Sequence, residues 1–272
     1  MRVFIPKHLC WRPDIPDFQD LIPESPEILD LLPNRKLPDL ALPIAVNLSE
    51  YLLSYSTSPD EMACPTSAVC TKLVEYFIYR CTGKAEPLSA RFVTHSAAKL
   101  ERSGCPGLRS NLKAIQKFGI PPNSINESFS GTLSDSILFG ISDELRATFY
   151  FRIGSLSCGE STTRELKSWI ARGFPIACGL SVPSSLEYDG AIDFRPTFDS
   201  IQGGHATLLI GFDDKYLAAS RGAFRIYCPW GNDWGEQGFG WLPYSYAERR
   251  MTLDFWTILN REWVASGELF NV

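Results

Sequence analysis

The hydrophobic pattern of this chain changes near residue 175, and that change limits the folds it can adopt. Residues 65–80 place apolar side chains at the i, i+3, i+4, i+7 spacing of one buried helix face, after a proline suited to a first helical position. Residues 108–118 and 163–172 repeat the helical pattern, and a glycine closes each of them. The sequence therefore predicts that the part before residue 175 is mainly helical.

Short apolar runs follow, bounded by glycine, proline and aspartate, and they have the length of strands. These runs are PIACGLSV (175–182), ATLLIGF (206–212), AFRIYC (223–228), FGWLP (239–243) and LDFWTIL (253–259). Because helices come first and strands later, we expect an α+β protein in which a helical lobe packs on a β-rich lobe. Residues 46–148 should form the mainly helical lobe and residues 149–272 the mainly β lobe of one domain, 46–272.

The first 45 residues are rich in proline and aspartate, as in WRPDIPDFQDLIPESPEILDLLPNRKLPDLALP. Recurrent prolines exclude a long helix. Apolar residues such as Ile15, Phe18 and Leu21 are scattered among them, which favours an extended arm braced on the body over the alternative of a disordered tail. We therefore treat residues 1–45 as an N-terminal arm of the fold.

The composition is that of a globular protein. The chain has 272 residues, of which 44% are hydrophobic and 21% charged, so it can bury a core. A net charge of -5 gives no reason to expect nucleic acid or an anionic membrane as a partner. No apolar run approaches the roughly 20 residues of a membrane helix. The first residues lack the apolar stretch of a secretory signal, and we expect an intracellular protein.

Cysteine and histidine are the residues that could carry chemistry. Eight cysteines are present, none in a CxxC pair, and with three histidines the spacing of a zinc site is absent, so we expect no metal or cofactor. In a reducing compartment most of these cysteines would be free and buried, and no disulfide pair is assigned. Cys64 alone stands at a predicted helix start, where the helix dipole stabilises a thiolate. Cys70 lies on the core face of the same helix, where burial opposes ionisation.

His205 is the candidate base. It stands in GGHATLLIGF, directly before a predicted buried strand, and two glycines before it permit close approach of other backbone. Histidine exchanges protons near neutral pH better than any other side chain. His8 and His95 lack such a setting, and we expect His95 to have a surface or capping role on a helix.

The stretch GGHATLLIGFDD…GAFRIYCPWGNDWGEQGFGWLPYSY resembles the C-terminal half of papain-family cysteine peptidases. The WGxxWGxxG core of that family is matched by Trp230, Gly231, Trp234, Gly235 and Gly238. CWRPDIPDFQD (10–20) is similar to the GWxPDLPDxRD opening of a microbial and viral branch, and the resemblance extends from about residue 10 to 258. It implies a helical left lobe and a β-rich right lobe with a substrate cleft between them. It also implies hydrolysis of peptide or protein substrates through a thioester, without a cofactor.

By position, the resemblance makes Cys64 the nucleophile and His205 the general base and acid. The family's cysteine lies about 18 residues after the valine of its VDLR motif, and Val46 plus 18 is 64. The separation of 205 − 64 = 141 residues falls within the roughly 130–150 residues typical of the family. Trp230 and Trp234 correspond to the tryptophans that wall the histidine, with simple packing as the alternative.

Two supporting residues of the family are replaced. Cys228 occupies the position of the asparagine that orients the histidine, and a thiol accepts hydrogen bonds poorly. Ser58 occupies the position of the glutamine in the oxyanion hole, a donor whose loss typically costs ~10²–10³ in rate. A shifted alignment would place Ser67 at the nucleophile position, although its helix stripe indicates a core residue. Two hypotheses follow: an active cysteine peptidase, or an inactive homologue that serves as a binding or structural module.

Overall fold

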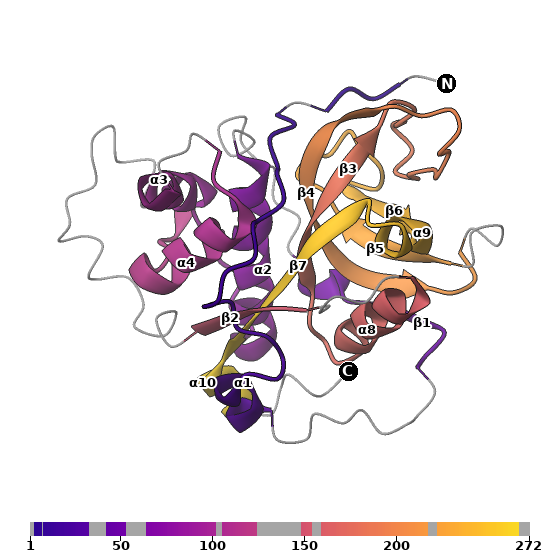
Figure 1. The fold of residues 1–272 in the computed structure, drawn as a ribbon. Coiled ribbons are helices and arrows are strands. Elements are labelled where there is room, and N and C mark those ends of the chain that lie inside the picture. The colour runs from indigo at the N-terminus through magenta and orange to yellow at the C-terminus, as the bar shows by residue number, and fades with distance from the viewer. Residues whose placement is uncertain are drawn as a thin grey trace.

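The computed structural model describes residues 3–6, 8–32, 42–52, 64–101, 105–123, 148–153, 159–216 and 222–266, apart from the side chains of 262, 265 and 266. Ser58 and Cys158 therefore lie outside the described residues. Within these ranges helices gather on one side and an antiparallel sheet on the other (Figure 1). This arrangement confirms the predicted α+β class.

In the described ranges, the helical side consists mainly of α2 (Pro65–Thr82), α3 (Ala90–Glu101) and α4 (Leu108–Phe118). Pro65 takes the first helical position of α2, and Gly83 ends that helix in the left-handed conformation, with φ of 68°. The helices predicted at 65–80 and 108–118 are thus confirmed. His95 is an exposed residue of α3.

The sheet contains seven strands within the described residues, and six of them follow the order β2-β7-β3-β4-β5-β6, with β1 also pairing with β4. Their bounds are β1 (Ala45–Asn47), β2 (Thr148–Arg152), β3 (Ile176–Pro183), β4 (Ile201–Asp213), β5 (Ala223–Tyr227), β6 (Phe239–Pro243) and β7 (Thr252–Asn260). All pairings are antiparallel. The five predicted strands correspond to β3 through β7, whereas β1 and β2 were not predicted.

Shorter elements complete the described fold. These are α1 (Pro26–Leu31), the 3₁₀ turn η1 (Ser49–Tyr51), α8 (Glu160–Ala171), α9 (Tyr244–Glu248) and α10 (Arg261–Ser266). Helix α8 is the predicted 163–172 helix, and it begins three residues earlier, at Glu160. It lies beside β4 and α9 on the sheet side of the molecule (Figure 1).

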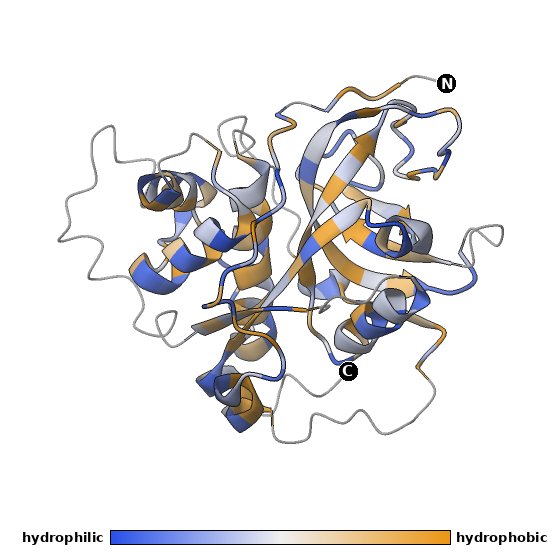
Figure 2. Ribbon diagram, viewed as in Figure 1, coloured by the Kyte–Doolittle hydropathy of each residue, from blue (hydrophilic) through white to orange (hydrophobic). Residues whose placement is uncertain are grey.

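Helix α2 is the centre of the core, because it packs against β3 and β4 as well as against α3 and α4. Its side chains are buried on almost every face, including Val69, Leu73 and Phe77 at 0% exposure. Figure 2 shows hydrophobic residues concentrated on α2 and on the central strands, while α3, α4 and α8 carry hydrophilic residues outward. The two lobes therefore share one core.

The N-terminal arm is docked over its described length. The backbone N–H of Phe4 donates to Leu186 O (2.7 Å), and the N–H of Trp11 donates to Gly204 O (3.1 Å). Further along, Leu21 O accepts from the backbone N–H of Arg152. Figure 1 shows this indigo segment running between the helices and the sheet. Apart from α1, the described residues of 3–32 form no helix, and turns occur at 18–19 and 23–24.

Charged side chains fasten the middle of the arm to both lobes. Asp14 Oδ2 accepts from the backbone N–H of Arg109, and the N–H of Asp14 donates to Asp254 Oδ2 at 2.7 Å. Asp20 pairs with the Arg109 guanidinium at 2.6 Å, and Arg152 pairs with Asp254 at 2.5 Å. Burial raises the pKa of Asp254 to about 6, although the charge of Arg152 opposes that shift.

A disulfide joins Cys10 of the arm to Cys105, just before α4, across 95 residues of sequence. Cys64, Cys70, Cys178 and Cys228 are free. In the described part of the chain, no helix combines the length and apolar character needed to cross a membrane. The same residues contain no group of three histidine, cysteine or acidic side chains that could hold a metal ion.

Ile28 tests whether the arm contributes to stability. Its side chain in α1 is 1% exposed within the core, whereas that of the neighbouring Leu29 is 38% exposed. We expect Ile28→Ala to lower the free energy of unfolding by about 2–4 kcal/mol, because it leaves a cavity, and Leu29→Ala to change it by less than about 0.5 kcal/mol. Urea unfolding followed by circular dichroism measures both. Equal, small effects would show that the arm is not part of the cooperative fold.

Candidate active site

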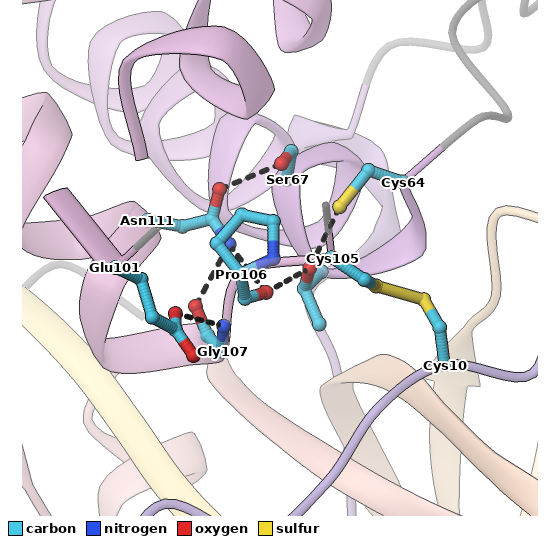
Figure 3. Close-up of a disulfide and its surroundings, with 9 residues drawn as sticks. Cys10, Cys64, Ser67, Glu101, Cys105, Pro106, Gly107 and Asn111 are labelled. Carbon is cyan, nitrogen blue, oxygen red and sulfur yellow. Dashed lines mark hydrogen bonds between the residues drawn. A yellow bond between two sulfur atoms is a disulfide. The ribbon is translucent and has the colours of Figure 1, made fainter. Parts of the chain in front are cut away.

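Cys64 is placed by the start of helix α2. It is the N-cap residue, with extended backbone (φ −134°, ψ 98°), and 2% of its surface is exposed. The unpaired N–H groups of the first helical turn lie beside it and favour negative charge there. Figure 3 shows its sulfur at the end of the helix, beside the loop that carries Cys105 and Pro106.

Thr66 determines the hydrogen bonding of the Cys64 thiol. Thr66 Oγ1 lies 2.8 Å from the carbonyl oxygen of Pro106 and 3.0 Å from Cys64 Sγ. A hydroxyl has one proton, and a carbonyl oxygen can only accept, so the Thr66 proton is directed to Pro106. The Cys64 thiol is therefore the donor to Thr66. A thiolate would require the hydroxyl to rotate and donate to sulfur instead.

His205 lies in strand β4, opposite Leu180 of β3, and its side chain is 0% exposed. Its Nδ1 is 2.7 Å from the backbone oxygen of Ala206. Because a carbonyl only accepts, Nδ1 carries the proton and Nε2 carries the lone pair. Nε2 is buried, with no hydrogen-bond partner among the described residues. The imidazole is thus held in the tautomer that a general base requires.

The surroundings of His205 oppose its protonation. Burial lowers the pKa of the imidazole from 6.5 to about 3, and His8 of the arm adds a smaller electrostatic effect in the same direction. No carboxylate is near enough to contribute to this shift, among the described residues. In this arrangement His205 is neutral throughout the physiological range, and accepting a proton from a thiol is unfavourable.

Trp230 packs directly on His205, with ring centres 4.8 Å apart. Trp234 packs edge-on against Trp230 at 4.5 Å, and its indole N–H donates to Glu187 O. Phe4 of the arm covers both tryptophans, with ring centres 5.5 Å and 6.5 Å away. Trp230 is therefore in contact with the histidine, while Trp234 supports Trp230.

Cys228 is buried and makes no hydrogen bond to His205 within the described structure. Its sulfur lies 3.2 Å from Thr207 Oγ1, and that hydroxyl donates to Tyr227 O at 2.9 Å. Burial raises the pKa of the Cys228 thiol to about 12, so it remains neutral. The carbonyl of Ala206 orients the imidazole instead. No sequence pattern predicts this backbone contact.

Ser67 is fully buried in α2, and its hydroxyl donates to Asn111 Oδ1 at 2.6 Å. Asn111 in turn donates to the carbonyl oxygens of Pro106 and Gly107. Ser67 thus helps to hold the loop before α4 against α2, as the core interpretation of its position predicted. Cys70 behaves likewise as a core residue, because burial raises its pKa well above the usual value.

The arm lies directly beside His205. The Trp11 ring covers Gly179 and Gly204, where a Cβ atom would collide with it, and Leu9 lies against Gly203. A cavity of about 780 Å³ remains between arm residues 9–15, the Cys105–Arg109 loop and Gly203–Gly204. Helix α2, which starts at Cys64, packs against strand β4, which carries His205. No hydrogen bond joins Cys64 to His205 in the described part of the chain.

Comparison with known proteins shows which family this chain resembles. Residues 144–251 match the family model described as papain family cysteine protease. An uncharacterized peptidase C1-like protein of Acanthamoeba polyphaga mimivirus is 30% identical over 100 residues, which is 35% of this chain. The match spans 30% of the length of that curated relative.

Solved structures with the same fold include xylellain, a cysteine protease from Xylella fastidiosa, with a TM-score of 0.67 and 24% identity. The alignment covers 92% of this chain and 95% of xylellain. The bromelain protease from Ananas comosus, in complex with the E64 inhibitor, aligns with a TM-score of 0.57 and 19% identity over 79% of this chain and 97% of its own. These likenesses establish the two-lobe papain-like fold.

The buried, neutral His205 has a consequence for stability. The unfolded chain binds a proton at this residue below pH 6.5, whereas the folded chain does so only near pH 3, so His205 lowers stability as pH falls through that window. Asp254 acts oppositely between pH 6 and 3.8. We expect the loss on acidification, up to ~1.4 kcal/mol per pH unit, to be smaller in His205→Asn than in the wild type. Urea unfolding from pH 7 to 4 measures it, and parallel curves would contradict the assignment.

Thr66 should control the reactivity of Cys64. Thr66→Ser keeps a hydroxyl that can donate to a thiolate, whereas Thr66→Val removes it. Because a hydrogen bond to a charged group is worth ~1.5–3 kcal/mol, we expect Thr66→Val to slow alkylation of Cys64 by iodoacetamide by about tenfold or more at a fixed pH. Thr66→Ser should remain close to the wild type. Mass spectrometry of the Cys64 peptide gives the rates, and equal rates in all three proteins would contradict the role of Thr66.

Proposed function

We propose that this chain, which belongs to the papain-like C1 family, hydrolyses peptide bonds with Cys64 as the nucleophile and His205 as the general base and acid. The observation that carries the proposal is the tautomer of His205, whose bare Nε2 faces no other partner among the described residues. A thiol at a helix start completes the pair of groups that this chemistry needs. Helix α2, whose N-cap is Cys64, packs against strand β4, which carries His205.

The chemistry follows from these two groups. The Cys64 proton passes to His205 Nε2, and the thiolate attacks the carbonyl carbon of the scissile amide. The resulting oxyanion collapses as His205 returns the proton to the departing amine, which leaves a thioester on Cys64. Water, deprotonated by His205, then attacks the thioester and releases the acid product and the free thiol. No cofactor is needed for any of these steps.

The replaced supporting residues are compatible with this chemistry. Cys228 does not provide a good hydrogen-bond acceptor for the imidazole. The carbonyl of Ala206 accepts from Nδ1 instead, and it would stabilise the imidazolium as it forms. The backbone N–H of Cys64 and the start of α2 can donate to an oxyanion. The substrate class we propose is peptide or protein, bound in extended form between the lobes.

We also propose an intracellular location, on the basis of cysteine chemistry. Four described cysteines, Cys64, Cys70, Cys178 and Cys228, are free, which is typical of a reducing compartment. The Cys10–Cys105 disulfide would be exposed to cellular dithiols there.

A second candidate is an inactive member of the family that binds a partner. Two observations favour it: the imidazolium form of His205 is strongly disfavoured, and Cys228 replaces the orienting residue. In that case Cys64 and His205 would persist as packing residues. Substitution of either one should then leave partner binding unchanged.

Turnover and labelling separate the two candidates. We expect the full chain, treated with a dithiol, to cleave a mixture of unstructured peptides and to react with the epoxide E64 at Cys64. Cys64→Ala and His205→Ala should each lower turnover by about 10³-fold or more, since the two groups act as a unit.

Cys81→Ser is the matched control, because Cys81 is another cysteine of the same helix and lies near its opposite end. It should retain wild-type turnover. Peptide cleavage that survives Cys64→Ala would rule out the proposed nucleophile. A folded protein without cleavage or E64 labelling would favour the inactive candidate.

A further inference from the structure

The N-terminal arm occupies the position that an extended peptide would take beside His205. The Trp11 N–H donates to the carbonyl of Gly204, the residue directly before the histidine, so the arm already uses this backbone acceptor. The Trp11 ring covers Gly179 and Gly204, and 7% of its surface is exposed. A substrate peptide cannot use these surfaces while the arm is in place.

The arm is anchored on both sides of this point. Before it, Val3 and Phe4 pair with Glu187 and Leu186, in the segment that follows β3. After it, Asp14 is fixed to Arg109. The segment between these anchors crosses from the sheet to the helical lobe, and it could open locally without unfolding the body.

One covalent bond prevents that opening. Cys10, adjacent to Trp11, is bonded to Cys105, and Cys105 is followed by Pro106, whose carbonyl accepts from Thr66 beside Cys64. Figure 3 shows the disulfide and the Cys64 sulfur on the same side of the helix α2 start. The disulfide therefore ties the arm to the loop that contacts the nucleophile region.

One polar group of Trp11 has no partner in the docked arm. Its indole N–H is buried without a hydrogen-bond partner among the described residues, and opening would let water satisfy it. The contact between Trp11 and the two glycines is otherwise apolar. Besides the disulfide, the described contacts that hold this segment include the backbone hydrogen bond from Trp11 to Gly204 and the apolar contacts of Trp11 and Leu9 with Gly179, Gly203 and Gly204.

We propose that the Cys10–Cys105 disulfide is a redox latch that keeps the arm over the Cys64–His205 site, and that its reduction lets residues 8–12 open and a peptide substrate enter. This proposal rests on the proposed function of Cys64 and His205. Opening also exposes His205 to water, which allows the imidazolium to form. The arm then acts as an intramolecular competitor that is removed without proteolysis.

The redox step uses an external dithiol. Its thiolate attacks one sulfur of the Cys10–Cys105 bond, which forms a mixed disulfide and releases the other sulfur as a thiolate that takes up a proton. The second thiol of the reductant then displaces the remaining cysteine. In total the dithiol is oxidised to a disulfide, and two electrons and two protons pass to Cys10 and Cys105.

Two readouts on the full chain test the latch, each with and without prior treatment by dithiothreitol, which is removed before measurement. Amide hydrogen exchange of the peptide containing Trp11 reports opening of the arm and does not depend on catalysis. Labelling of Cys64 by E64, located by mass spectrometry, reports access to the site. We expect reduction to increase both rates in the wild type by about tenfold or more, because the open fraction limits both.

Cys105→Ser gives the same state without a reductant, and Cys81→Ser is the matched control. We expect Cys105→Ser to exchange and to label rapidly before any treatment, and Cys81→Ser to respond to reduction as the wild type does. The comparison of oxidised and reduced wild type holds even if Cys105→Ser fails to fold, which circular dichroism would reveal.

Unchanged exchange at Trp11 after reduction would overturn the latch, as would Cys64 labelling and peptide cleavage at equal rates in the oxidised and reduced protein. In that second case the proposed function would stand. Faster exchange at Trp11 without any labelling or cleavage at Cys64 would support the opening of the arm and overturn the proposed function.

Discussion

The burial of helix α2 between two layers is the constraint on which the rest of this structure depends. A helix enclosed on nearly all sides must find partners for its polar side chains within the protein, and α2 uses both near and distant ones. Lys72 pairs with Glu75, and Glu75 also accepts from the backbone of Leu88 at the start of the next segment. The buried helix therefore fixes its neighbours as well as its own first residue, Cys64.

The same close packing makes the site inaccessible in the conformation described here. His205 is enclosed by Trp230, by the glycines before it and by the arm, so its neutral form is strongly favoured. The Cys64 thiol donates to Thr66 Oγ1 at the same time. The Cys64 thiol and the neutral His205 are thus in the state that precedes proton transfer. A movement of the arm would expose the histidine to water.

The sequence predicted the elements that depend on local pattern. Helix α2 and its start at Cys64 followed from hydrophobic periodicity and one proline, and the strand after His205 followed from a short apolar run. Strand β1 was missed because it is only three residues long, whereas β2 has the aromatic residues of a strand and is followed closely by Gly154 and Ser155, so its pattern could have predicted it. The similarity of the arm to one branch of the family stays a prediction.

Contacts between distant segments could not be predicted from pattern. The Cys10–Cys105 disulfide closes 95 residues of chain, and eight cysteines allow many pairings, so spacing alone cannot select it. The Ala206 carbonyl that orients His205 is a backbone group, which every residue possesses. The role of Thr66 depends on the path of the loop at Pro106, which is 40 residues away in sequence.

A crystal structure of the reduced chain after reaction with E64 tests the central claim most directly. We expect the inhibitor to be bonded to Cys64 Sγ, with His205 Nε2 within hydrogen-bonding distance of the adduct or the sulfur. We also expect Trp11 to be displaced from Gly179 and Gly204. An unmodified Cys64, or a structure in which Trp11 still covers Gly204 while the inhibitor is bonded to another cysteine, would contradict the assignment of this site.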